Sequence, residues 1–226
     1  FKGKEGIATS IGHSPISALV NPVAGSRTAI GEALSNLVWA PLKEGMKSVS
    51  LSANWMWACK NEGEDARLYE AVKGCSDFAI ELGINIPTGK DSLSMKQKYP
   101  NDEVIAPGTV IISAAGNCSN ITKVVEPVLR FHSDGMTAGS IYYINLSQDD
   151  FKLGGSSFAQ TLNKIGSETP TIKDADFFKR AFNTIQNLIK DRQIIAGHDI
   201  GSGGLITTLL EMCFADVNLG AKISFN

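Results

Sequence analysis

The sequence predicts an α+β fold, and two patterns support that prediction. Several stretches repeat apolar residues at the 3.6-residue period of an amphipathic helix, whereas others are short, alternating and rich in β-branched residues. These segments do not follow each other as strict strand–helix pairs, so an α+β arrangement is favoured over a parallel doubly wound sheet. With 226 residues, 43% of them hydrophobic, the chain can bury the core of one large domain or two small ones.

The first predicted elements are a helix over 28–40, a strand over 47–53 and a second helix that begins at the acidic residues of 62–65. The second helix is expected to end at Gly83, because glycine readily adopts the left-handed conformation of a helix stop. Each helix has one apolar face that we expect to be buried. The two faces consist of Ile30, Ala33, Leu34, Leu37, Val38 and Pro41, and of Leu68, Val72, Cys75, Ala79 and Leu82.

Two further strands are expected, a short one over 84–86 and a β-branched one over 109–115, with a loop over 87–92 between them. The stretch 134–139 contains two glycines and few large apolar residues, which is typical of a linker. It divides the chain into predicted subdomains 1–133 and 140–226.

The second subdomain is expected to contain strands over 141–146 and 193–196 and a long helix over 175–190. That helix should bury Phe178, Ala181, Phe182, Ile185 and Ile189. Shorter helices should follow two glycine-rich turns, 153–157 and 197–204, the last with an apolar stripe of Leu205, Leu209, Met212 and Cys213. Because the chain begins with Phe1 and stops within an expected strand, we expect a piece of a longer protein whose second subdomain is truncated.

Composition excludes several classes of function. The chain has 21 Lys and Arg against 23 Asp and Glu, so its net charge of −2 argues against a nucleic-acid groove. No apolar run approaches the roughly 20 residues of a membrane-spanning helix. The four cysteines are too far apart for a CxxC pair and too few for a disulfide framework, which favours a reduced, cytoplasmic protein.

The most informative stretch is the glycine turn 197–204, which lies between a predicted strand and a predicted helix. Glycines let backbone N–H groups approach an anion, and a helix N-terminus adds partial positive charge. Asp199 beside this turn would then be a natural Mg²⁺ ligand for a nucleotide phosphate. A tight turn in which Asp199 caps the helix is an equally good interpretation.

Glu32 and Asn36 are four residues apart and therefore point the same way from one helix. Carboxylate and amide oxygens are donors that Mg²⁺ accepts, although a solvated helix face is the usual explanation of such a pair. Trp39 lies on the same face, and a large aromatic residue there indicates that another subdomain or a ligand covers it.

The stretch Thr88–Ser92 is not a P-loop, because its glycine spacing is wrong and Asp91 stands where the Ser or Thr belongs. Its glycine, cation, carboxylate and hydroxyls suit either a Mg²⁺–phosphate or polar substrate contact, or a solvated turn. No residue in the chain presents a clear pattern for a catalytic nucleophile or general base.

Together these motifs resemble the phosphoribosylformylglycinamidine synthase family, in its large single-chain form. The matching stretches cover nearly the whole chain and read GEALSN (31–36), LSANWMW (51–57), GEDARLY (63–69), PTGKDSLSM (87–95) and HD…GGL (198–205). The resemblance implies two fused copies of the aminoimidazole-ribonucleotide-synthetase fold. This chain matches the second copy, namely its N-terminal subdomain with a mixed sheet and helices, followed by part of its C-terminal α/β subdomain.

The activity that the resemblance implies is that of an ATP-dependent carbon–nitrogen ligase of purine biosynthesis with glutamine as amide donor. ATP activates the formamide oxygen of formylglycinamide ribonucleotide, and ammonia displaces phosphate to give formylglycinamidine ribonucleotide, ADP and phosphate. The ammonia comes from a C-terminal glutaminase domain. The implied partners are therefore the ribonucleotide, the first synthetase copy and the glutaminase, and the isolated chain should be inactive.

Carried over position by position, the resemblance implies that Glu32, Asn36 and Asp199 bind Mg²⁺ and that Gly201 or Ser202 contacts ATP or ADP. Gly89, Asp91 and Ser92 match a loop that contributes to ATP–Mg²⁺ and substrate binding, with Lys90 in place of a glycine of smaller relatives. The turn departs from the family pattern HDxSDGG, because it reads HDIGSGG from His198 to Gly204 and lacks the second acid.

Two alternatives remain open on the sequence. The chain is a non-catalytic half whose nucleotide only holds the protein together, or it belongs to another ATP-using member of the same fold group, such as a selenophosphate-synthetase or hydrogenase-maturation type.

Overall fold

The computed structural model describes residues 3–130, 139–217 and 220–224. Its N-terminal part contains a four-stranded mixed sheet with the strand order β1-β6-β2-β3, as expected for the α+β class. The strands are β1 (Gly6–His13), β2 (Val49–Met56), β3 (Asn85–Ser92) and β6 (Thr109–Cys118). Both β1 and β2 pair antiparallel with β6, whereas β3 pairs parallel with β2, so β1 and β3 are the two edges.

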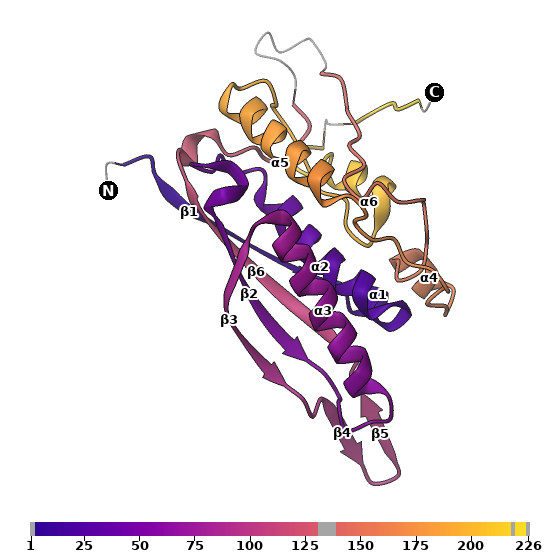
Figure 1. The fold of residues 1–226 in the computed structure, drawn as a ribbon. Helices are drawn as coiled ribbons and strands as arrows, with labels where there is room; N and C mark the ends of the chain where they lie inside the picture. Colours follow the sequence, from indigo (N-terminus) through magenta and orange to yellow (C-terminus); the bar gives the residue numbers. More distant parts are fainter. Residues whose placement is uncertain (1–2, 131–138, 218–219, 225–226) are drawn as a thin grey trace.

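Helices α2 (Pro22–Leu37) and α3 (Glu64–Leu82) lie on one face of this sheet (Figure 1). The expected stripe of α2 is buried, with Ile30, Leu34 and Leu37 at 2% exposure or less. The helix begins earlier than predicted because Pro22 occupies its first turn and the Asn21 side chain accepts a hydrogen bond from the Ala24 N–H. None of the helices in the described part of the chain is long and apolar enough to span a bilayer.

The second helix ends as predicted, and Cys75, Ala79 and Leu82 of its expected stripe are buried, but one residue of that stripe is exposed. Gly83 adopts the left-handed conformation with φ of 72°, and α3 stops there. Val72, expected in the core, is 41% exposed, and Phe78 is fully buried in its place. The core-facing stripe therefore keeps most of the predicted residues and also includes Phe78 and Gly74, and Val23 of α2 packs directly above Gly74.

The predicted loop over 87–92 is wrong, because these residues form most of strand β3. Thr88, Gly89 and Lys90 pair with Ser52, Ala53 and Asn54 of β2. This pairing satisfies the backbone hydrogen-bonding groups of these residues. The local sequence contains a proline and a glycine, which argue against a strand, so it gave no reason to expect the pairing. The strand predicted over 47–53 begins two residues later, after a 3₁₀ turn at Gly45–Ser48, and continues to Met56.

A hairpin of β4 (Lys96–Tyr99) and β5 (Asp102–Ile105) projects from one end of the molecule (Figure 1). The other short elements are helices α1 (Pro15–Val20) and α4 (Ser157–Thr161), and the 3₁₀ turn at Ile121–Lys123. Helix α4 is shorter than the helix to residue 165 that the sequence predicted.

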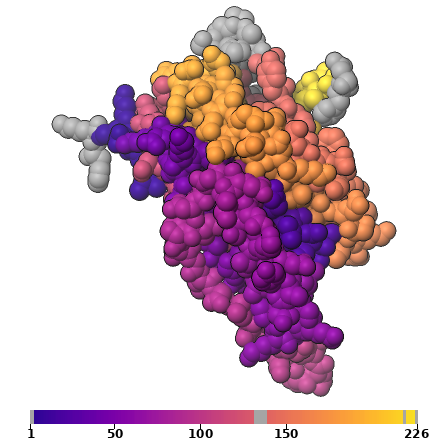
Figure 2. Space-filling view, viewed as in Figure 1, coloured from indigo at the N-terminus to yellow at the C-terminus, as the bar shows by residue number. Residues whose placement is uncertain are grey.

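Helices α5 (Ala175–Lys190) and α6 (Gly204–Glu211) carry the C-terminal part. Helix α5 has the predicted bounds, and its residues Phe178, Phe182, Ile185 and Ile189 join α2, α3 and the sheet in one hydrophobic core. The C-terminal part therefore lies directly against the N-terminal part, as the space-filling view also shows (Figure 2).

The strands predicted over 141–146 and 193–196 are wrong, because both segments are irregular. A strand requires a neighbour for its backbone groups, and among the described residues no strand lies beside either segment. Most of the predicted linker, 134–138, lies outside the described residues, so the domain boundary stays a prediction.

Candidate functional site

Glu32 lies in the middle of α2 and reaches the end of β1. Its Oε2 accepts a hydrogen bond of 2.9 Å from the backbone N–H of His13, an edge-strand group with no strand neighbour on that side. The carboxyl is thereby held at a fixed place beside the β1–α1 turn. Sequence reasoning missed His13 here, because its contribution is a backbone N–H that any residue supplies.

Asn36 follows Glu32 by one helical turn and is exposed. Its Nδ2 donates to the Glu32 carbonyl at 3.1 Å, and its Oδ1 accepts no hydrogen bond from the described residues. The amide oxygen is thus free to bind a ligand from the same side of the helix.

Asp199 lies in the turn before α6, and neighbouring groups fix its backbone. Its carbonyl oxygen lies 2.8 Å from His198 Nδ1 and 3.2 Å from the hydroxyl of Thr208. The imidazole also lies 3.3 Å from a carboxylate oxygen of Glu211. Asp199 does not cap α6, whose first residue is preceded by Gly203 without a side-chain cap, so the capping interpretation is wrong.

The carboxyl groups of Glu32 and Asp199 are near enough to interact electrostatically. The pKa of Glu32 is raised above its ordinary value, first because the carboxyl is desolvated by burial and further because the Asp199 carboxylate is near. The hydrogen bond and charge of His13 oppose this rise only in part. Two carboxylates that repel each other in a partly buried place favour a bound cation.

Gly201 and Ser202 lie in the same turn as Asp199. Gly201 is exposed, and no described atom lies where a Cβ would stand, so its backbone is open to a ligand. Ser202 contacts the other glycine-rich turn, since its carbonyl accepts from the Ser157 N–H at 3.0 Å and the two hydroxyls are 3.3 Å apart. Both glycine-rich turns, 153–157 and 197–204, were visible in the sequence, but nothing in it indicated that they contact each other.

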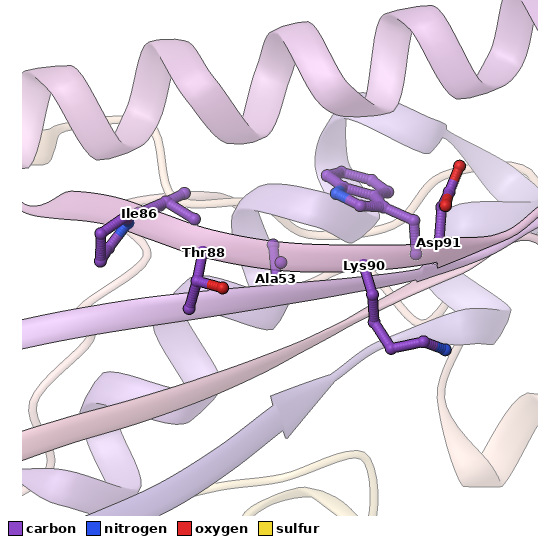
Figure 3. Close-up of a pocket in the computed structure, with 8 residues that line it drawn as sticks. Ala53, Ile86, Thr88, Lys90 and Asp91 are labelled. Atoms are coloured by element: carbon purple, nitrogen blue, oxygen red, sulfur yellow. The ribbon is translucent and has the colours of Figure 1, made fainter.

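The other predicted binding residues, Gly89 to Ser92, lie along β3, and Gly89, Lys90 and Asp91 line a pocket of about 470 Å³. Because side chains alternate along a strand, Asp91 points to the helix side of the sheet and Lys90 to the opposite side (Figure 3). The Lys90 ammonium lies 3.4 Å from the hydroxyl of Ser92. Gly89 packs flat on Ala53, whose carbonyl oxygen would lie 2.3 Å from an added Cβ.

The two sets of predicted residues lie at opposite edges of the sheet. One row of paired residues runs from His13 through Ile111 and Asn54 to Lys90. Three strand spacings of ~4.8 Å place the ends of this row roughly 14 Å apart. Glu32, Asn36, Asp199, Gly201 and Ser202 therefore form one candidate site, which we call the β1-edge site, and Gly89–Ser92 form another.

The donors of the β1-edge site fit a magnesium ion that arrives with a phosphate. Two carboxylates and one amide oxygen are hard ligands, and Mg²⁺ is usually held by one or two carboxylates plus phosphates and waters. No group of three or more His, Cys, Asp or Glu in the described part of the chain is placed so that it could hold a metal ion.

Two family models match the chain. The FGAR-AT PurM_N-like domain matches residues 1–117, and the C-terminal domain of AIR synthase related proteins matches residues 144–226. Curated relatives include a probable phosphoribosylformylglycinamidine synthase of Arabidopsis thaliana, chloroplastic/mitochondrial by name, with 43% identity over 95% of this chain. The human phosphoribosylformylglycinamidine synthase is 40% identical over 96% of it. The chain spans only 15% and 16% of the length of these relatives.

Solved structures show the same fold at low sequence identity. The Thermotoga maritima PurL structure with FGAR has a TM-score of 0.65 at 15% identity and covers 92% of this chain and 31% of its own. The same protein with AMPPCP has a TM-score of 0.57 at 13% identity, covering 92% and 29%. Since the first family model alone matches more than half of the 226 residues, the chain belongs to the FGAR-AT PurM_N-like domain family.

Proposed function

We propose that the chain is part of an ATP-dependent ligase of purine biosynthesis that converts formylglycinamide ribonucleotide, ATP and glutamine-derived ammonia to formylglycinamidine ribonucleotide, ADP and phosphate. The relatives at about 40% identity carry the name of this synthase, which favours it over a selenophosphate-synthetase or hydrogenase-maturation type. The first synthetase copy and the glutaminase domain are expected from the rest of the polypeptide. A cytoplasmic location remains a prediction.

Within this enzyme, we propose that the β1-edge site holds a Mg²⁺–nucleotide. The observation that supports it is the approach of Asp199 to Glu32, two acidic residues far apart in sequence, beside the open backbone of Gly201. Magnesium would be held by Glu32, Asp199 and Asn36 and would neutralise phosphate charge. The chain's own residues orient these donors through the His13 N–H and through His198 and Thr208.

Nucleotide binding tests this proposal. Addition of ADP with Mg²⁺ should raise the melting temperature of the natural full-length protein, because a ligand that binds only the folded state stabilises it. Glu32→Gln and Asp199→Asn should each reduce this rise, whereas Glu70→Gln, an exposed carboxylate on α3, should leave it intact. Equal shifts in all four proteins would contradict the proposed site.

A second candidate role for a nucleotide at the β1-edge site is structural. The separation of this site from Gly89–Ser92 is the observation that supports it. If the β1-edge nucleotide only holds the protein together, Glu32→Gln should lower the melting temperature without lowering turnover per folded molecule. Asp91→Asn, at the opposite edge, should then lower turnover without a comparable loss of stability. The reverse pattern would assign catalysis to the β1-edge site.

A further inference from the structure

Glu32 and Asp199 come from distant parts of the chain, so something must hold the turn that carries Asp199 against α2. Trp39 is placed to do this. Trp39 follows Glu32 by seven residues and Asn36 by three, just beyond the last residue of α2. The helical period places residues with these spacings on the same side. The ring is partly buried and packs against the hydrophobic core.

The ring of Trp39 lies directly on Gly197, two residues before Asp199. A Cβ added at Gly197 would lie 2.0 to 2.6 Å from three atoms of the indole six-membered ring. Such distances leave no space for a methyl group, so only glycine permits this contact. Gly197 lies in the predicted second subdomain, and another subdomain is one of the two occupants, the other being a ligand, that the sequence predicted for this face.

A short backbone relay, which consists of two hydrogen bonds through the segment 125–126, also joins Trp39 to Gly197. The carbonyl of Trp39 accepts from the N–H of Val125 at 3.0 Å, and the carbonyl of Glu126 accepts from the N–H of Gly197 at 3.2 Å. The segment 125–126 therefore joins the end of α2 to the beginning of the Asp199 turn.

The two ends of this relay are themselves fixed. On the α2 side, Gln186 of α5 is 1% exposed, donates to the carbonyls of Val38 and Ala40 at 2.5 and 2.9 Å, and accepts from the N–H of Leu42 at 2.7 Å. On the other side, His198 and Thr208 hold the Asp199 carbonyl against α6. Because Gln186 holds the α2 end, a displacement at Gly197 would move the Asp199 turn, together with the α6 residues that bind it, relative to Glu32.

We propose that Trp39 and Gly197 are positioning residues, whose contact sets the separation of Glu32 and Asp199 and thereby the metal affinity of the β1-edge site. The proposal rests on the proposed Mg²⁺–nucleotide site. Neither residue is expected to touch the ligand. Residues that orient metal ligands in this way typically change metal affinity by about 10- to 100-fold when they are altered.

The test measures Mn²⁺ affinity by electron paramagnetic resonance, in the presence of ADP, in the natural full-length protein. Gly197→Ala should weaken Mn²⁺ binding by about tenfold, and Trp39→Leu by a similar factor. Trp39→Phe, which keeps a flat ring but lacks the outer atoms of the indole that lie on Gly197, should fall between the wild type and Trp39→Leu. Gly220→Ala, where no described atom lies within 4 Å of the added Cβ, is the matched control and should change nothing.

Combination of the two substitutions separates positioning from general damage. Once Trp39→Leu removes the ring, the methyl group of Gly197→Ala has space, so the double variant should bind Mn²⁺ no worse than Trp39→Leu alone. Full additivity of the two losses would overturn the proposal. If Gly197→Ala fails to fold, the comparison of Trp39→Phe with Trp39→Leu remains, and equal affinities in that pair would also overturn it.

A crystal structure of the Gly197→Ala protein distinguishes failure of this inference from failure of the proposed function. If the wild type binds no Mn²⁺–ADP, or if Glu32→Gln binds it equally well, the proposed metal site is wrong. The positioning contact is then judged on geometry alone. An Asp199 that stays beside Glu32 in the Gly197→Ala structure would overturn the inference, whereas a displaced Asp199 would support it.

Discussion

At the scale of the residue, the contact between β1 and α2 depends on Gly12. A Cβ added there would lie 2.2 Å from the Ala29 carbonyl oxygen and 2.3 Å from the Ala33 nitrogen, both of them backbone atoms of a buried helix. We expect Gly12→Ala to lower the free energy of unfolding by about 1–3 kcal/mol, because strand and helix must separate. Urea denaturation would measure the loss.

Gly3→Ala is the matched control for that substitution, since no described atom lies within 4 Å of its added Cβ. Equal unfolding midpoints for the two variants would show that β1 moves freely on α2. Gly12 also precedes His13, whose N–H binds Glu32, so the same variant should reduce the melting-temperature rise with Mg²⁺ and ADP.

The sequence indicated Glu32 and Asp199 as oxygen donors, and their role as metal ligands stays a prediction. In the structure the Asp199 carboxylate contributes to the raised pKa of Glu32. Val72 was assigned to the core because of its type and spacing, yet it is 41% exposed, whereas Phe78 of the same helix is fully buried. The helical period predicts which residues share an apolar face, but not which part of the protein packs against that face.

At the scale of the element, Asp149 joins two irregular segments of the C-terminal part. Its side chain is fully buried and lies 3.2 Å from the ammonium of Lys152 and 2.6 Å from that of Lys173. Burial alone would raise the pKa of this carboxyl, but the hydrogen bonds from Lys173, from the N–H groups of Asp150 and Thr171, and from Lys152 lower it well below its ordinary value.

A carboxyl whose pKa is lower in the folded than in the unfolded state stabilises the fold above the unfolded value of about 3.9. That stabilisation is lost as the pH falls below this value toward the lowered pKa. We expect Asp149→Asn to reduce the melting temperature at neutral pH, with the difference from the wild type shrinking below about pH 4. Melting curves between pH 3 and 7 would measure it.

Asp150→Asn provides the comparison, because that side chain is exposed. Its melting temperature should follow the wild type throughout this pH range. If the Asp149→Asn difference is constant with pH, the contribution of Asp149 is one of packing rather than charge.

Helix α5 contributes to the core that the N-terminal sheet forms with α2 and α3. Phe178 is 1% exposed, and its ring meets that of Phe78 edge to face at 6.2 Å. We expect Phe178→Ala to cost about 3–5 kcal/mol of unfolding free energy in a single cooperative transition. Phe158→Ala on α4, where the ring is 60% exposed, should cost far less.

Chemical denaturation followed by both fluorescence and circular dichroism checks this expectation. Two separate transitions, with the N-terminal one unchanged in Phe178→Ala, would show that α5 is not part of the first core. Sequence period predicted the bounds of α5 correctly, since its apolar stripe is regular and Asp174 caps it through the Phe177 N–H. No pattern in the sequence around α5 indicated that its apolar stripe packs against residues more than 90 positions earlier.

At the scale of the whole molecule, the C-terminal part exposes a stretch of β-forming residues. Ile141, Tyr142, Tyr143 and Ile144 are 45–84% exposed and make no strand pairing in the described structure. Such segments associate through their free backbone groups and apolar side chains. We expect the 226-residue chain to self-associate with concentration, and Tyr142→Lys to reduce this in light scattering.

Tyr69→Lys is the control for this effect, because Tyr69 is 69% exposed but lies on α3, where the backbone is already hydrogen-bonded. Equal reduction by both substitutions would attribute the association to general surface hydrophobicity or charge. A reduction by Tyr142→Lys alone would attribute it to the unpaired stretch.

The sequence by itself determined the α+β class, the amphipathic helices and the stop at Gly83, because helical period and glycine conformation are local properties. The acidic metal donors that it indicated stay a prediction. Only the tertiary structure decided that residues 87–92 complete an edge strand, that α5 packs into the N-terminal core, and that the Asp199 carboxylate acts on the pKa of Glu32 while Gly89–Ser92 lie at the opposite edge of the sheet. Strand pairing and core packing join residues far apart in the chain, so no window of neighbouring residues contains the information that selects them.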